Sequence, residues 1–76
     1  MAKVKNLVPA FLIRMRAEAD ELGNKAIKLR DFIDNNPKYR EMDRIESMLM
    51  DTQLHAMCAY HDALACRIEI INGKEN

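Results

Sequence analysis

The sequence has no tryptophan, few aromatic residues of any kind, and no excess of either charge. Six methionines stand in place of large aromatics, which is typical of a helical core filled by flexible side chains. Twelve basic residues balance twelve acidic ones, which argues against a general nucleic-acid binder, since such proteins carry a basic excess. No stretch alternates apolar and polar residues with a period of two, so strands are not expected. The longest N-terminal apolar run, LVPAFLI, is too short to span a membrane.

A disulfide framework is also lacking. The only two cysteines, Cys58 and Cys66, are expected on one helix with their Cα atoms about 12 Å apart, beyond disulfide reach. Reduced thiols and the lack of a recognisable signal peptide indicate the cytoplasm. We expect one domain over residues 1–76, and a chain this short buries only about 60% of its unfolded surface. Its core therefore needs a staple or an oligomer.

What the sequence does have is helical periodicity. A heptad pattern of apolar residues passes through Gly23-Asn24 without changing phase, although this pair is the least helical in its neighbourhood. We therefore predict one continuous helix over about 9–34, beginning near Pro9 and ending before Pro37. The pattern consists of Met15, Ala19, Leu22, Ala26, Leu29 and Ile33.

A turn over 35–42 should lead into a second helix over about 43–72. Asp43 and Glu46 have the spacing of a capping box at its start, and Asn72-Gly73 is a strong stop signal at its end. The fold class is therefore all-α: an antiparallel helical hairpin with a short N-terminal arm.

The second helix carries two apolar rows, and one antiparallel neighbour can cover only one of them. We accordingly predict an obligate homo-oligomer. The large-residue row consists of Met50, Leu54, Met57, His61, Leu64, Ile68 and Ile71. The small-residue row consists of Thr52, Ala56, Ala59, Ala63 and Cys66, with Ile45, Leu49 and Ile70 at its ends.

No catalytic group, metal site or cofactor is expected. His55 and His61 lie about 240° apart around a helix axis, so with Cys58 they cannot converge on one ion. No serine or cysteine is paired with a histidine in a catalytic arrangement, and a lone hairpin has no cleft. We do not expect an enzyme.

One face of the first helix has the chemistry that a nucleotide needs. Phe11, Arg14, Lys25 and Lys28 lie within roughly a third of a turn, offering an aromatic ring and cations. Phe11 and Lys25 are, however, about 21 Å apart along the axis, so they could meet only if an antiparallel neighbour brought its own Lys25 beside Phe11. The simpler interpretations are a core phenylalanine and a solvated ion-paired face, with pairs such as Glu21–Lys25.

Several segments together resemble a family of small phage proteins. They are FLIRMRAEADELGNKAIKLRDFI, then NNPKY, then DTQLHAM, AY and ALACRI in the second helix, and their joint spacing rather than any single motif carries the likeness. The matching residues are Phe11, Arg14, Met15, Glu21, Leu22, Lys25, Lys28, Leu29, Phe32, Ile33, Asn36, Pro37, Gln53, Met57, Tyr60, Leu64, Arg67 and Ile68.

That family resembles the phage anti-CBASS sponges, whose helical hairpin is shared with some anti-Thoeris sponges. The resemblance implies a homohexamer in the cytoplasm of the infected bacterial host that sequesters cyclic oligonucleotides uncleaved, with no DNA, RNA or membrane partner. Cyclic dinucleotides such as cyclic GMP-AMP would lie between protomers, held by Phe11 and Lys25 with Arg14 beside them. Arg67 and Lys28 would form a second site for cyclic trinucleotides. Phenylalanine stands at position 11 where the family has tyrosine, which keeps the stacking surface but removes a hydroxyl.

Two other functions remain open from the residues alone. A structural or protein-interaction module would bind a host protein through its uncovered apolar row. A small nucleic-acid-binding regulator would show binding that weakens steeply with salt, but the balanced charge favours it least.

Overall fold

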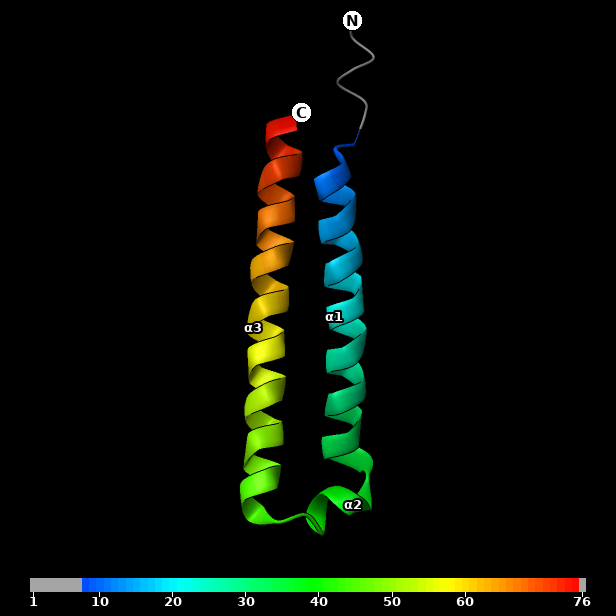
Figure 1. The fold of residues 1–76 in the computed structure, drawn as a ribbon, viewed down its shortest axis with the longest axis vertical. Helices are drawn as coiled ribbons and strands as arrows, with labels where there is room; N and C mark the ends of the chain where they lie inside the picture. The colour runs from blue at the N-terminus through cyan, green and yellow to red at the C-terminus, as the bar shows by residue number, and fades with distance from the viewer. Residues whose placement is uncertain (1–7, 76) are drawn as a thin grey trace, which may run out of the picture.

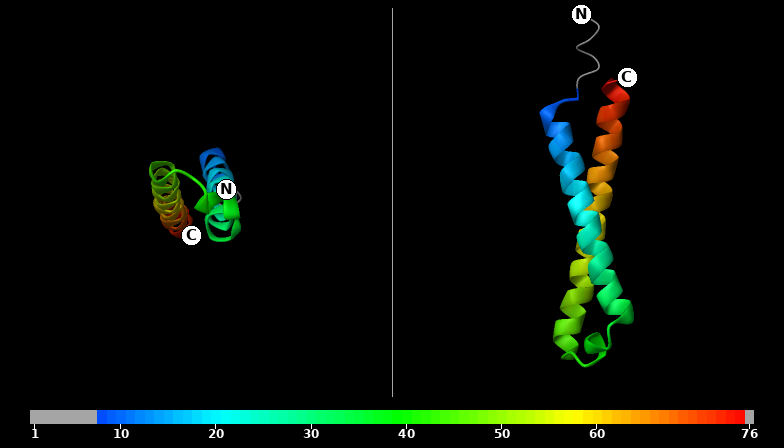
Figure 2. Two further views of the ribbon diagram at one scale, coloured as in Figure 1. Left: turned by 90° about the horizontal axis from the view of Figure 1, so that it is seen from below. Right: turned by 90° about the vertical axis from the view of Figure 1, so that its right-hand side faces the viewer.

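The computed structural model describes residues 8–75, and it is an antiparallel helical hairpin. Helix α1 (Ala10–Asn35) and helix α3 (Arg44–Glu75) run side by side, joined by the short helix α2 (Pro37–Arg40) (Figure 1). Seen from the side, the two long helices cross at a shallow angle (Figure 2). The all-α class and the hairpin are confirmed. The expected N-terminal arm lies outside the described residues.

The ends of α1 follow from its two prolines. The Pro9 carbonyl accepts hydrogen bonds from the N–H groups of Leu12 and Ile13, at 3.0 and 3.2 Å. At the other end Asn36 is extended, with φ −94° and ψ 122°, as expected of a residue that precedes proline. The Asn36 side chain then accepts a bond from the Lys38 N–H at 2.9 Å and so caps α2. Both ends of α1 lie within one residue of the prediction.

Helix α3 begins as predicted and ends later than predicted. It starts directly after Asp43, whose carbonyl accepts a bond from the Ser47 N–H at 2.9 Å. At the other end it continues through Asn72-Gly73 to Glu75, so the expected stop at residue 72 is wrong. A glycine stop needs a left-handed backbone, and Gly73 does not have a positive φ. Asn72 instead accepts a hydrogen bond from Arg16 Nη2 at 3.0 Å, which joins this end of α3 to α1.

The core is a single row of contacts between the two long helices. Five apolar side chains are buried, and all belong to the heptad pattern of α1, extended by Leu12, or to the large-residue row of α3: Leu12, Ala19, Ala26, Leu54 and Leu64. The radius of gyration is 17.4 Å, whereas a compact domain of this length would have about 11 Å. The hairpin is therefore a rod with very little interior.

The small-residue row of α3 is exposed along its whole length. Ile45, Leu49 and Ile70 at its ends are 67%, 63% and 59% exposed, and the alanines between them are exposed too. The sequence prediction that α1 would cover one row of α3 and leave the other bare is confirmed.

Candidate functional site

Gly23 lies inside α1, as the uninterrupted heptad phase predicted. A Cβ atom at this position would lie 3.4 Å from Cδ2 and Nε2 of His61 on α3. The space beside this glycine is therefore occupied by the imidazole of the same chain.

The two histidines have different surroundings, as their spacing predicted. His61 is half-buried between the helices, with Nδ1 3.7 Å from Asp62 Oδ1. His55 is exposed, and its Nδ1 lies 2.9 Å from the Asp51 carbonyl oxygen. Across residues 8–75, no three His, Cys, Asp or Glu side chains gather in a way that would hold a metal ion.

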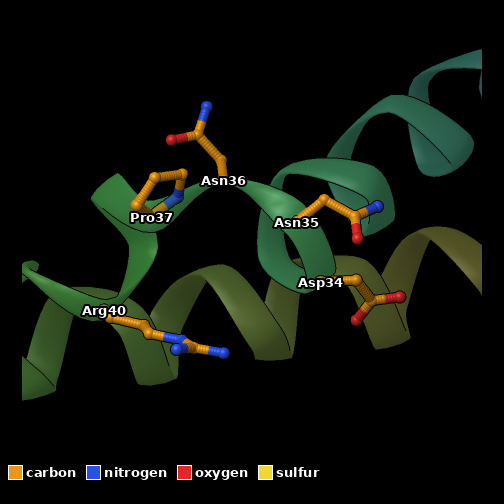
Figure 3. Close-up of a pocket in the computed structure, with 5 residues that line it drawn as sticks. All are labelled: Asp34, Asn35, Asn36, Pro37 and Arg40. Atoms are coloured by element: carbon orange, nitrogen blue, oxygen red, sulfur yellow. The ribbon is translucent and has the colours of Figure 1, made fainter.

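Two shallow grooves open on the hairpin. One, at the turn, has a volume of about 170 Å³ and is polar; it is lined by Asp34, Asn35, Asn36, Pro37 and Arg40, with Asn36 pointing away from Asp34 and Arg40 (Figure 3). The other has a volume of about 260 Å³, lies between the long helices, and is lined by Gly23, Ala26, Ile27, Cys58, His61 and Asp62. Neither groove contains any of the residues that the sequence proposed for nucleotide binding.

Those candidate residues are exposed on the outside of the helices. Phe11 is 41% exposed, and Arg14, Lys25, Lys28 and Arg67 are exposed as well. Phe11 is thus not a buried core residue. Neither Arg14 nor Lys25 has a carboxylate partner among the described side chains, so the expected pair Glu21–Lys25 is not formed.

One protomer does not bring the candidates together. Because α1 is unbroken, Phe11 and Lys25 remain fourteen residues apart, or about 21 Å along the axis. The contacts between the two long helices place Arg67 level with residues 17–21 of α1, so Lys28 lies about 10–16 Å from it along the axis. Both predicted sites therefore require residues from more than one chain.

The structure also places a residue that sequence reasoning left without a role. Tyr60 on α3 is 48% exposed, and the contacts between Gly23 and His61 and between Arg16 and Asn72 place it within about 5 Å of the level of Lys25 on α1. The position of Tyr60 relative to Lys25 depends on the register between the two helices. That register cannot be predicted from the periodicity of either helix alone. In the sequence, the bulky side chain of Tyr60 at the margin of the small-residue row was the one indication of a possible role.

The fold defines a small helical-hairpin protein whose candidate side chains lie on open outer surfaces rather than in a cleft. A family model described as Sequestin matches residues 9–70, and the chain belongs to that family. The family's description is compatible with a sequestering role. No curated protein and no solved structure matches the chain. Within residues 8–75, neither long helix has an apolar stretch of the length needed to cross a lipid bilayer.

Proposed function

We propose that the protein binds cyclic oligonucleotide second messengers and sequesters them without cleaving them, so that a phage evades CBASS immunity in the infected cell. Membership of the Sequestin family supports this, as does the resemblance to anti-CBASS sponges. The observation that carries it is the exposed Phe11 and Lys25 on an unbroken α1. They offer a stacking surface and a cation that can converge only between chains.

Self-assembly is part of the proposal. The small-residue row of α3 is exposed, and a second copy that covers it removes an apolar surface from water. The alanines allow a close approach of helices, and the resemblance implies six copies. In such an assembly Phe11 of one protomer meets Lys25 of another, with Arg14 nearby. Arg67 and Lys28 supply the second site, for cyclic trinucleotides.

The chemistry is that of retention rather than turnover. A cyclic dinucleotide carries two negative charges, so a local pair of cations is sufficient, and the zero net charge of the chain is no obstacle. The ring of Phe11 stacks on a base while the Lys25 ammonium neutralises a phosphate. No catalytic group takes part, so the ligand leaves as it entered.

Titration calorimetry with 3′,3′-cyclic GMP-AMP tests the function and the site together. We expect Phe11→Ala and Lys25→Ala each to weaken binding by about tenfold or more, since each removes one stacking or charge contact. Lys38→Ala is the matched control, because this exposed lysine lies in α2, away from the site, and its variant should bind as the wild type does. Mass spectrometry should recover the ligand intact.

Two results would contradict the proposal in different ways. Unchanged affinity in both variants would reject the site, while failure of the wild type to bind any member of a cyclic-nucleotide panel would reject the function. The bare small-residue row also supports an alternative, a module that binds a host protein. A stoichiometric host protein on a pull-down without bound nucleotide would favour it.

A further inference from the structure

Tyr60 and Lys25 offer a second aromatic ring and cation at nearly the same level of a single hairpin. We propose that Tyr60 is a ligand-binding residue whose ring stacks on a base of the nucleotide held by Lys25. This inference rests on the proposed function and adds to it a site residue from the protomer that supplies the lysine. The ligand would then lie on an edge of the hairpin, open to a neighbouring copy.

The positions of Lys25 and Tyr60 along the long axis of the hairpin follow from contacts between the two helices. Gly23 on α1 meets the imidazole of His61 on α3 at 3.4 Å, measured from the position of a Cβ. The helices are antiparallel, so two residues forward on α1 and two back on α3 bring Lys25 level with Ala59, one residue or about 1.5 Å from Tyr60. The hydrogen bond between Arg16 and Asn72 brings Lys25 level with Ala63 instead, three residues or about 4.5 Å beyond Tyr60, so Tyr60 lies between the two levels.

Their shared side of the hairpin follows from helix geometry. Gly23 and Cys58 both line the groove on one flank of the buried row. Lys25 and Tyr60 are each two residues further along their own helix, which is about 200° around the axis. Both therefore lie on the flank opposite the groove. Lys25 immediately precedes the buried Ala26, and Tyr60 lies four residues before the buried Leu64, so both are at the edge of the contact between the helices.

The ring of Tyr60 is available for stacking. It is 48% exposed, and among the described residues the only close aromatic contact joins Phe32 to Tyr39. The hydroxyl of Tyr60 makes no hydrogen bond to any described group, whereas that of Tyr39 lies 3.4 Å from the Ser47 carbonyl oxygen. Within residues 8–75, the ring therefore makes no aromatic contact and its hydroxyl makes no hydrogen bond.

The neighbours along the same edge show why the site is centred on Lys25. One heptad towards the termini, about 10 Å away, the corresponding positions are Glu18 on α1 and Arg67 on α3. At that level the acidic Glu18 lies opposite the basic Arg67. At Lys25 the opposite residue is an aromatic ring, and the combination of a flat apolar surface with a cation suits a base joined to a phosphate.

The two tyrosines of the sequence allow a direct measurement. In a Tyr39→Phe variant, Tyr60 is the only tyrosine and the chain has no tryptophan, so its fluorescence reports on that one ring. We expect 3′,3′-cyclic GMP-AMP to quench this emission with the same midpoint as calorimetric binding. Tyr60→Ala should weaken binding by about tenfold or more, and Tyr60→Phe, which keeps the stacking face, should bind within about threefold of the wild type.

The outcomes separate this inference from the function beneath it. If the wild type binds while Tyr60→Ala keeps its affinity and the emission of Tyr60 does not change, Tyr60 is not in the site although the function stands. If the wild type binds no cyclic nucleotide, the function fails and this inference fails with it. If the Tyr60→Ala variant does not fold, the fluorescence titration still decides the question. That titration uses the Tyr39→Phe variant, in which Tyr60 is unchanged.

Discussion

At the scale of single residues, Gly23 is disfavoured by helix propensity and is not required by its contact with His61. Glycine in the middle of a helix costs about 1 kcal/mol relative to alanine. A Cβ at this position would lie 3.4 Å from the imidazole of α3, which leaves room for a methyl group but not for a larger side chain.

Replacing this glycine by alanine should stabilise the protein. The new Cβ would meet the ring of His61 at 3.4 Å, an ordinary contact, while the helix gains up to about 1 kcal/mol of propensity. Gly23→Leu should do the opposite, because its branched side chain must displace the ring. Urea unfolding followed by circular dichroism, at one fixed protomer concentration, measures both changes.

Gly73→Ala is the control for that experiment. A Cβ there meets nothing within 4 Å, so this variant reports propensity alone, at the less stable end of a helix. A Gly23→Ala protein less stable than the wild type would show that the ring tolerates no Cβ and would contradict the prediction.

At the scale of elements, α3 has two opposite faces of the same apolar character, and only one of them is covered by α1. The buried Leu64 and the exposed Leu49 illustrate the difference, with 3% and 63% of their surfaces exposed. We therefore expect Leu64 to contribute to the stability of the hairpin and Leu49 to contribute to self-association.

Truncating these two leucines tests that division. Leu64→Ala should lose about 2–5 kcal/mol of stability through lost burial and a cavity, a large share of the total for so small a core. Leu49→Ala leaves the contact between α1 and α3 intact and should instead weaken the association of copies. Thermal unfolding across a range of protomer concentrations separates the two effects. Equal losses that do not depend on concentration would contradict this division.

The elements also show what sequence alone could and could not predict. The uniform heptad phase and the two prolines were sufficient for α1. The spacing of residues on α3 predicted two apolar rows of which one would be covered, but it did not tell which row packs against α1. The stop at Gly73 was wrong because a glycine permits a left-handed backbone without requiring one, and Asn72 bonds to Arg16 instead. The pairing of Lys25 with Tyr60 depends on the register between helices, which no pattern within one helix encodes.

At the scale of the whole molecule, the hairpin has very little interior, and we expect it to be unstable as a monomer. Its principal extents are 61 × 15 × 15 Å, and two of its five buried side chains are alanines. Ordering the backbone costs about 1–2 kcal/mol of conformational entropy per residue. The single row of contacts between α1 and α3 offsets only a small part of that cost. We therefore expect further burial to come from surfaces that the hairpin leaves exposed, such as the small-residue row of α3.

A charge in the middle of that row should therefore separate the copies. In Ala59→Glu, a carboxylate would be buried wherever a second helix packs against α3, at a cost of several kcal/mol. We expect light scattering at micromolar concentration to show an oligomer for the wild type and a monomer for this variant, with reduced helix content. Ala17→Glu introduces the same charge on the exposed surface of α1 and should leave the mass unchanged. A wild type that is folded and monomeric at that concentration would overturn the assembly, and with it any site in which Phe11 and Lys25 come from different chains.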